Sequence, residues 1–178
     1  MKTPSLSDNK AGKMFIYEDI LREFQKQKVQ YIVIGGVAVN LLGALRSTAD
    51  LDVLLEMSES NIKRFLAVLK KYKYHLKQPI DLMQITDKKT REYLVRKKNL
   101  KAVNFYKTGG FEEVDVIIDT PVTFQEAQKD INWVRGGAVN IPLISIEGLI
   151  KMKKKSGRIV DKLDIEALKR VKRLRESK

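Results

Sequence analysis

The spacing of hydrophobic residues divides the first part of the chain into alternating helices and strands. From Met14 to about Lys28, apolar residues recur at the three- and four-residue intervals of an amphipathic helix. The run YIVIGG at 31–36 predicts a short strand and a tight turn, because two glycines stop a β-branched segment. A short helix is expected at 37–45, and DLDVLLE at 50–56 predicts the second strand.

The middle of the chain predicts one more helix and a β-hairpin. Ser58 or Ser60 can cap a helix with an apolar stripe, after which Pro79 rules out a continuous helix through 73–86. Residues 87–98 are interpreted as a charged helix or loop. KAVNFY and FEEVDVIID flank Lys-Thr-Gly-Gly and predict two antiparallel strands.

The C-terminal part, about 145–176, predicts two helices. AVNIPLIS at 138–145 is interpreted as a short strand or an extended segment, and the helix that follows ends near Gly157. The last helix starts at about Arg158. Five apolar residues fall on one face of it: Val160, Leu163, Ala167, Val171 and Leu174.

This order of elements predicts an α/β (α+β) fold, with a small mixed sheet flanked by helices. Residues 1–12 are polar and contain Pro, Ser and Gly, which predicts a flexible N-terminal arm. Residues 13–178 are then expected to form a single domain, because 178 residues fit one hydrophobic core.

Composition narrows the class of protein. The chain is 43% hydrophobic and contains no apolar run of the roughly 20 residues that span a membrane, so we expect a globular protein without membrane contact. The absence of cysteine excludes disulfides, thiolate metal sites and a cysteine nucleophile, and favours the cytoplasm. A net charge of +13 suits nucleic acid, nucleotides or an acidic partner, although solvated surface lysines would give the same charge.

Two aspartates interrupt the apolar strand at 50–56. Alternate residues of a strand share a face, so Asp50 and Asp52 point the same way. Two adjacent carboxylates repel each other unless a cation lies between them, and Mg²⁺ is the ion that such a pair suits best. Aspartates are also common at strand starts as turn residues, so this pair alone has little specificity.

Three further features strengthen a magnesium and phosphate interpretation. Gly35-Gly36 opens a helix, where backbone N–H groups can approach an anion, although an ordinary turn has the same residues. Asp115 lies between two valines of a predicted strand and supplies a third carboxylate, with Glu113 as the competing candidate. Arg46 and Thr48 directly precede the aspartates, where they can hold a phosphate.

A Gly-Gly turn that opens a helix, then R-x-T-x-D-h-D-h (h, hydrophobic) and a later strand acid, resembles the nucleotidyltransferase superfamily. That superfamily includes DNA polymerase beta, aminoglycoside nucleotidyltransferases and the minimal nucleotidyltransferases of toxin–antitoxin systems. Residues 142–168 are similar to the C-terminal part of bacterial nucleotidyltransferases related to abortive-infection toxins. The positions that carry this second match are Glu147, Leu149, Lys153, Gly157, Arg158, Asp161, Asp164 and Leu168.

The resemblance implies a Mg²⁺-dependent enzyme that moves a nucleoside monophosphate from a nucleoside triphosphate, such as ATP, to an acceptor hydroxyl. It assigns Mg²⁺ to Asp50, Asp52 and Asp115, which are also the catalytic residues, with the proton of the hydroxyl going to Asp115. Gly35 and Gly36 would receive the triphosphate, assisted by Arg46, Thr48 and Lys153. For Asp161, pairing with Arg158 or a nearby lysine is favoured over a catalytic role.

Acceptor and partner stay open at this level. An RNA or tRNA end, a protein side chain and a small molecule are all compatible acceptors, and the positive charge favours RNA. The resemblance also allows a toxin that an antitoxin-like protein neutralises. The competing interpretation is a non-catalytic module that keeps the fold and binds nucleic acid or a partner protein. The retained acids argue against it, because buried carboxylates without a cation are destabilising.

Overall fold

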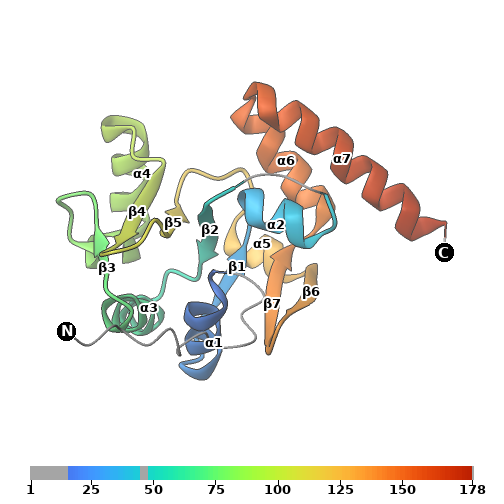
Figure 1. The fold of residues 1–178 in the computed structure, drawn as a ribbon. Coiled ribbons are helices and arrows are strands. Elements are labelled where there is room, and N and C mark those ends of the chain that lie inside the picture. Colours follow the sequence, from blue (N-terminus) through green and yellow to red (C-terminus); the bar gives the residue numbers. More distant parts are fainter. Residues whose placement is uncertain (1–15, 45–47, 178) are drawn as a thin grey trace, which may run out of the picture.

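The computed structural model describes residues 16–44 and 48–177, so the expected arm at 1–12 and the candidate Arg46 lie outside the described residues. Figure 1 shows helices packed around a central sheet. The described helices are α1 (Glu18–Lys26), α2 (Gly35–Leu41), α3 (Glu59–Lys71), η1 (a 3-10 helix, Leu82–Thr86), α4 (Lys88–Lys98), α5 (Phe124–Gln128), α6 (Ile146–Ser156) and α7 (Ile159–Glu176). The described strands are β1 (Tyr31–Val33), β2 (Asp50–Leu55), β3 (Tyr74–Leu76), β4 (Ala102–Lys107), β5 (Glu113–Ile117), β6 (Ile131–Gly136) and β7 (Val139–Ile144).

The described strands form one mixed sheet in the order β3-β4-β5-β2-β1-β7-β6. β2 lies at its centre, parallel to β5 and antiparallel to β1. β1 pairs parallel with β7, and the β3–β4, β4–β5 and β6–β7 pairs are antiparallel. The mixed sheet with flanking helices and the β4–β5 hairpin were both predicted from the sequence, and both are confirmed.

Local sequence signals explain where several elements begin. Ser58 caps α3 by accepting a hydrogen bond from the Asn61 N–H, which settles the choice between Ser58 and Ser60. Thr123 and Glu126 form a reciprocal capping box at α5. The sequence pattern predicted neither α5 nor β6, because neither segment has an apolar periodicity long enough to be recognised.

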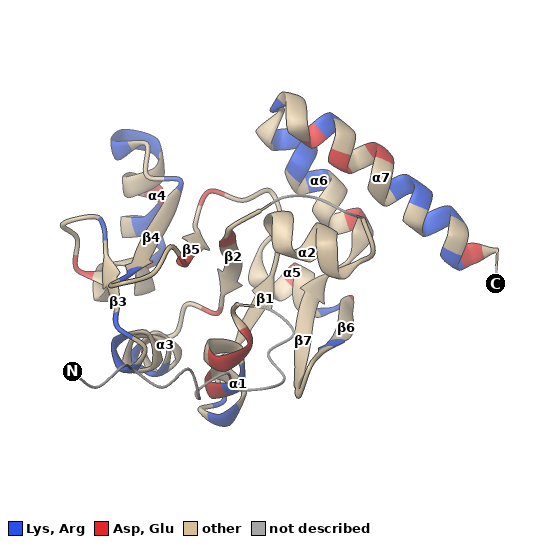
Figure 2. Cartoon of the chain, in the orientation of Figure 1, with Lys and Arg blue, Asp and Glu red and all other residues tan. Residues whose placement is uncertain are grey.

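The packed face of α7 coincides only in part with its predicted apolar stripe: Ala167 and Val171 pack against the core, but the rest of the stripe does not. Leu163 and Leu174 are 64% and 62% exposed, whereas Asp161, Asp164 and Leu168 are buried. The cause is Lys153 of α6, whose buried ammonium group pairs with both aspartates and draws them inward. In Figure 2 the second half of α7 extends from the body with many basic residues. No described helix is long and apolar enough to cross a membrane.

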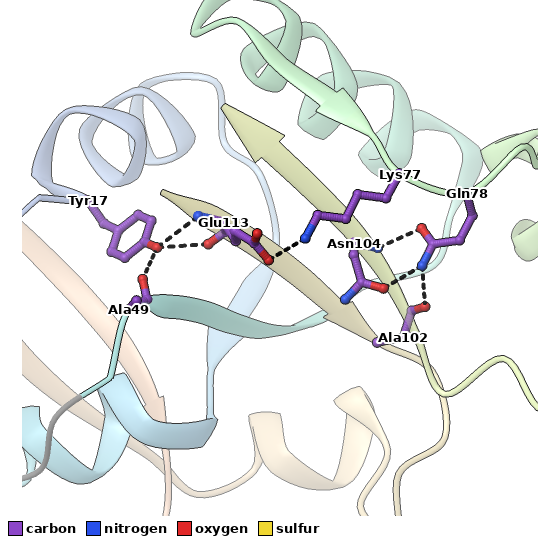
Figure 3. Close-up of polar contacts among 7 residues, drawn as sticks. All are labelled: Tyr17, Ala49, Lys77, Gln78, Ala102, Asn104 and Glu113. Atoms are coloured by element: carbon purple, nitrogen blue, oxygen red, sulfur yellow. Dashed lines mark hydrogen bonds and ion pairs between the residues drawn. The ribbon is translucent and has the colours of Figure 1, made fainter. Parts of the chain in front are cut away.

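Tyr17 connects the starts of the two central parallel strands. Its ring is buried, and its hydroxyl contacts the carbonyl oxygen of Ala49 and lies 2.8 Å from that of Glu113 (Figure 3). The same hydroxyl accepts a hydrogen bond from the Glu113 N–H at 3.2 Å. One side chain therefore satisfies backbone groups at the beginning of both β2 and β5.

We predict that Tyr17→Phe lowers the free energy of unfolding by about 1–2 kcal/mol, because backbone groups at two strand starts lose their bond to this buried hydroxyl. Urea denaturation measures the change. The matched control is Tyr93→Phe, at an exposed tyrosine of α4, which should shift the free energy by less than about 0.5 kcal/mol. Equal effects of the two substitutions would contradict a connecting role for the Tyr17 hydroxyl.

Candidate active site

The parallel register of β2 and β5 brings the sequence-predicted acids together. Asp52 lies opposite Asp115, and Asp50 lies opposite Glu113 two residues earlier along the pair. Because side chains alternate between the faces of a sheet, all these acids share one face. The intervening Leu51 and its partner Val114 are fully buried on the other face.

A cavity of about 540 Å³ lies over this face, between the strands and the helices α6 and α7. Asp52 and Asp115 line it, together with Gly35. Basic groups line it as well: Lys101, Lys153, Lys155 and Arg158. Among the lining residues that the structure describes, neither Asp50 nor Glu113 occurs, so Asp52 and Asp115 are the pair that faces the cavity.

Asp52 is held in an environment that opposes its charge. Burial is the main cause that raises its pKa to about 7, and the carboxylates of Asp115 and Asp50 add to the effect. The positive charges of Lys153 and Arg158 offset part of it. A carboxyl group in this position needs a cation to be stably ionised at neutral pH.

The surroundings of Asp115 also oppose the ionised form of its carboxyl group. Burial raises its pKa, as do the charges of Asp50 and Glu113, whereas a hydrogen bond from the Asn104 side chain and the charge of Lys77 lower it. Its Oδ1 atom is buried and has no hydrogen-bond partner in the described part of the chain. Such an unsatisfied oxygen is costly unless a ligand completes it.

These two carboxylates fit a Mg²⁺ ion. Mg²⁺ typically takes one or two carboxylates and completes its shell with waters and phosphate oxygens, and the unsatisfied Oδ1 of Asp115 offers such a ligand. Within residues 16–44 and 48–177, no three acidic or histidine side chains form a complete metal-binding set. Asp50 is exposed at the first position of β2, so its part in metal binding stays a prediction.

Gly35 shapes the wall next to Asp52. It has a φ of +68°, and a Cβ at this position would lie 1.9 Å from the Oδ2 of Asp52. The turn is tied to the strand because the Ile34 N–H donates to the Asp52 carbonyl at 3.0 Å. Gly36 is buried in α2 and Thr48 is half-buried before β2; neither is among the described residues that line the cavity.

Lys153 reaches the cavity from α6 and is only 4% exposed. Its Nζ lies 2.6 Å from the Oδ2 of Asp164 and 3.2 Å from the Oδ1 of Asp161. Arg158 pairs with the other oxygen of Asp161 at 3.1 Å. Although burial opposes ionisation, hydrogen bonds from Arg158, Ser156 and Lys153 lower the pKa of Asp161 to about 2. Asp161 thus pairs with Arg158 and with a lysine, as was expected from the sequence in preference to a catalytic role.

Sequence reasoning missed part of the cavity wall. Lys101 and Lys155 line it but belong to charged segments without a distinguishing pattern, and Lys155 pairs with Asp119 at 2.6 Å. Asn104 was also missed, although the hairpin offered a signal. Aligning β4 with β5 places this amide directly opposite Asp115.

Comparisons with known proteins identify the family and the fold of this chain. A family model described as "Nucleotidyltransferase of unknown function (DUF6036)" matches residues 14–175. The crystal structure of the lincosamide antibiotic adenylyltransferase LnuA, with lincomycin bound, superposes with a TM-score of 0.57 at 16% identity. The match covers 86% of this chain and 94% of LnuA.

A second similar structure is ANT(2")-Ia in complex with adenylyl-2"-tobramycin, with a TM-score of 0.56 and 13% identity. It covers 90% of this chain and 92% of that chain. At these identities the two likenesses establish a shared fold. No curated protein sequence matches this chain.

We predict that Asp52→Asn stabilises the metal-free protein at high pH. A folded-state pKa of about 7, raised from 3.8, means that the folded protein keeps a proton which the unfolded chain releases between these values. The free energy of unfolding therefore falls as the pH rises from about 4 to 7. The substitution removes this loss, so the variant should be more stable than the parent by about 1–3 kcal/mol near pH 8, with little difference near pH 4.

Urea denaturation at the two pH values, with a chelator present, measures this difference. The matched control is Asp130→Asn, at an exposed aspartate that does not line the cavity. A parent protein whose stability relative to Asp52→Asn is the same at both pH values would contradict the raised pKa.

Proposed function

Because this chain belongs to a family of nucleotidyltransferases of unknown function, we propose that it moves a nucleoside monophosphate from a nucleoside triphosphate to an acceptor hydroxyl group. The observation that carries the proposal is the register of Asp52 with Asp115 at the wall of one cavity. Both neighbouring structures concern adenylyl transfer, and this supports ATP as the donor.

Asp52 and Asp115, with Asp50 as a third ligand, would hold Mg²⁺. When bound, the ion would neutralise charge on the phosphates and stabilise the departing pyrophosphate. Gly35 lets the backbone approach the triphosphate, with Gly36 and Thr48 beside it and Arg46 as a further cation.

The remaining steps belong to side chains of this chain. Lys153 and Arg158 line the opposite wall, from which they attract the phosphates and orient the donor. The Asp115 carboxylate, beside the reacting phosphate, accepts the proton of the acceptor hydroxyl. The new bond joins the acceptor oxygen to the α-phosphorus as the bond to the pyrophosphate oxygen breaks, so the transfer is balanced.

RNA, with tRNA as the prime case, is our proposed acceptor. The net charge of +13 and the basic residues along α7 in Figure 2 support a polyanionic substrate. A small-molecule acceptor is the second candidate, since the named neighbours have lincomycin or adenylyl-tobramycin bound and share most of their length with this chain. A protein side chain is the third.

We further propose that the enzyme acts in the cytoplasm as the toxin of a toxin–antitoxin pair. The support is the resemblance of residues 142–168 to abortive-infection-related nucleotidyltransferases. The exposed apolar residues Ile159, Leu163 and Leu174 on α7 offer a surface to a neutralising partner protein. The test is growth of cells that express the chain, compared with cells that express Asp52→Asn.

We predict that Asp52→Asn and Asp115→Asn reduce transfer by more than the roughly 10–100-fold that loss of an outer-shell metal partner costs, because each removes a carboxylate of the cavity pair. Each α-labelled nucleoside triphosphate is incubated with Mg²⁺ and, separately, with total RNA, total protein or small metabolites. The labelled fraction identifies the acceptor class.

The exposed-site variant Asp130→Asn serves as the control and should retain full transfer. A protein that labels no fraction, is not stabilised by Mg²⁺ with any nucleoside triphosphate, and still binds RNA in a salt-sensitive way would be the non-catalytic binding module instead.

A further inference from the structure

Asn104 lies beside the acid at the cavity wall, on the strand next to it. β4 pairs antiparallel with β5 so that Asn104 faces Asp115 across the ladder. The two side chains are therefore on the same face of the sheet, and hydrogen bonding by the Asn104 side chain is among the causes that lower the pKa of Asp115. Oδ1 of Asp115 has no partner in the described part of the chain, so Oδ2 is the oxygen that we assign to the Asn104 amide.

The orientation of the Asn104 amide is set by Gln78, in the segment that follows β3. The Gln78 Nε2 donates to the Oδ1 of Asn104 and lies 3.4 Å from the carbonyl oxygen of Ala102, while its Oε1 accepts from the Asn104 N–H at 3.0 Å (Figure 3). An amide has one accepting and one donating end. With Oδ1 occupied by a donor from Gln78, the NH₂ end of Asn104 is the end that faces Asp115.

Lys77, the residue before Gln78, forms an ion pair with Glu113, the other acid on this face of β5. The Lys77 N–H donates to the Asn104 carbonyl at 2.9 Å, which anchors the segment to β4. Its side-chain Nζ pairs with the Oε2 of Glu113 at 2.6 Å. The segment after β3 therefore engages Glu113 in an ion pair, while Asp115 keeps one oxygen without a partner in the described part of the chain.

We propose that Asn104 is a positioning residue, oriented by Gln78, which holds one oxygen of the Asp115 carboxylate and leaves Oδ1 available to a divalent cation. This inference rests on the proposed function, because it takes Asp115 as a metal ligand. Outer-shell partners of this kind orient a ligand and typically contribute 10–100-fold to metal affinity.

The test measures Mn²⁺ binding to the full chain, because Mn²⁺ binds carboxylates more tightly than Mg²⁺ does and its free form is detected directly by electron paramagnetic resonance. Asn104→Ala removes the donor to Asp115. Gln78→Glu keeps an acceptor for the Asn104 N–H but replaces the donor, so Asn104 should rotate its amide and turn Oδ1 toward Asp115. Both variants should weaken Mn²⁺ binding about 10–100-fold.

Gln78→Ala leaves the amide free to rotate and should have a smaller effect than Gln78→Glu. The matched control is Asn140→Ala, at an exposed asparagine of β7 that does not line the cavity, and its Mn²⁺ affinity should equal that of the parent. Thermal unfolding without metal identifies any variant that is not folded, and the remaining variants then decide the outcome.

The possible failures are distinguishable. If Asn104→Ala and Gln78→Glu are folded and bind Mn²⁺ as tightly as the parent, the amide pair serves only to join β3 to β4, and the positioning role is overturned. If the parent protein itself binds no Mn²⁺, the proposed function fails and this inference fails with it.

Discussion

The parallel pairing of β2 with β5 is the constraint on which the site depends. It places Asp52 opposite Asp115 and Asp50 opposite Glu113, whereas a slip of one residue would turn one set of acids into the core. The apolar residues that alternate with them fix this register, because Leu51 and Val114 are fully buried on the opposite face. Tyr17 supports it at the strand starts by bonding to the backbone on both sides. The same strand register therefore determines both the packing of the sheet and the positions of the candidate catalytic acids.

This alignment is unfavourable for the protein without a ligand. Burial and the neighbouring carboxylates raise the pKa values of Asp52 and Asp115, so each ionised form is opposed by its surroundings. The hydrogen bond from Asn104 and the charges of Lys153 and Arg158 reduce this opposition without removing it. Sites that keep such a conflict commonly perform a function that needs it, because substitution by a neutral residue would relieve it.

The sequence predicted the parts of the site that depend on local pattern. The apolar run around Asp50 and Asp52, the glycine turn and the β4–β5 hairpin each follow from spacing over a few residues. The parallel contact of β2 with β5 joins segments about sixty residues apart, and no local pattern encodes it. The sequence preferred Asp115 to Glu113 only because two valines flank it; that Asp115 lines the cavity while Glu113 pairs with Lys77 follows from the three-dimensional packing.

The packed face of α7 could not be predicted from the sequence, for a different reason. Apolar periodicity identifies a buried face only where burial is hydrophobic, and here the packed side carries Asp161 and Asp164. Their partner Lys153 lies on another helix, so the ion pairs that determine the packing become visible only in three dimensions. Of the five residues that the periodic pattern had grouped together, Val160, Leu163 and Leu174 are exposed, whereas Ala167 and Val171 pack against the core.

The charges around the cavity bear on the proposed role of a metal ion. Its described lining contains four acids (Asp52, Asp115, Asp119 and Asp161) and four bases (Lys101, Lys153, Lys155 and Arg158). Two of the bases share Asp161, and Lys155 is paired with Asp119, so much of the positive charge is already balanced. A triphosphate carries several negative charges, and this balanced wall cannot neutralise them by itself. Under the proposed function, a polyphosphate would therefore need cations of its own, and the pair of Asp52 and Asp115 is where we propose that such cations gain the most.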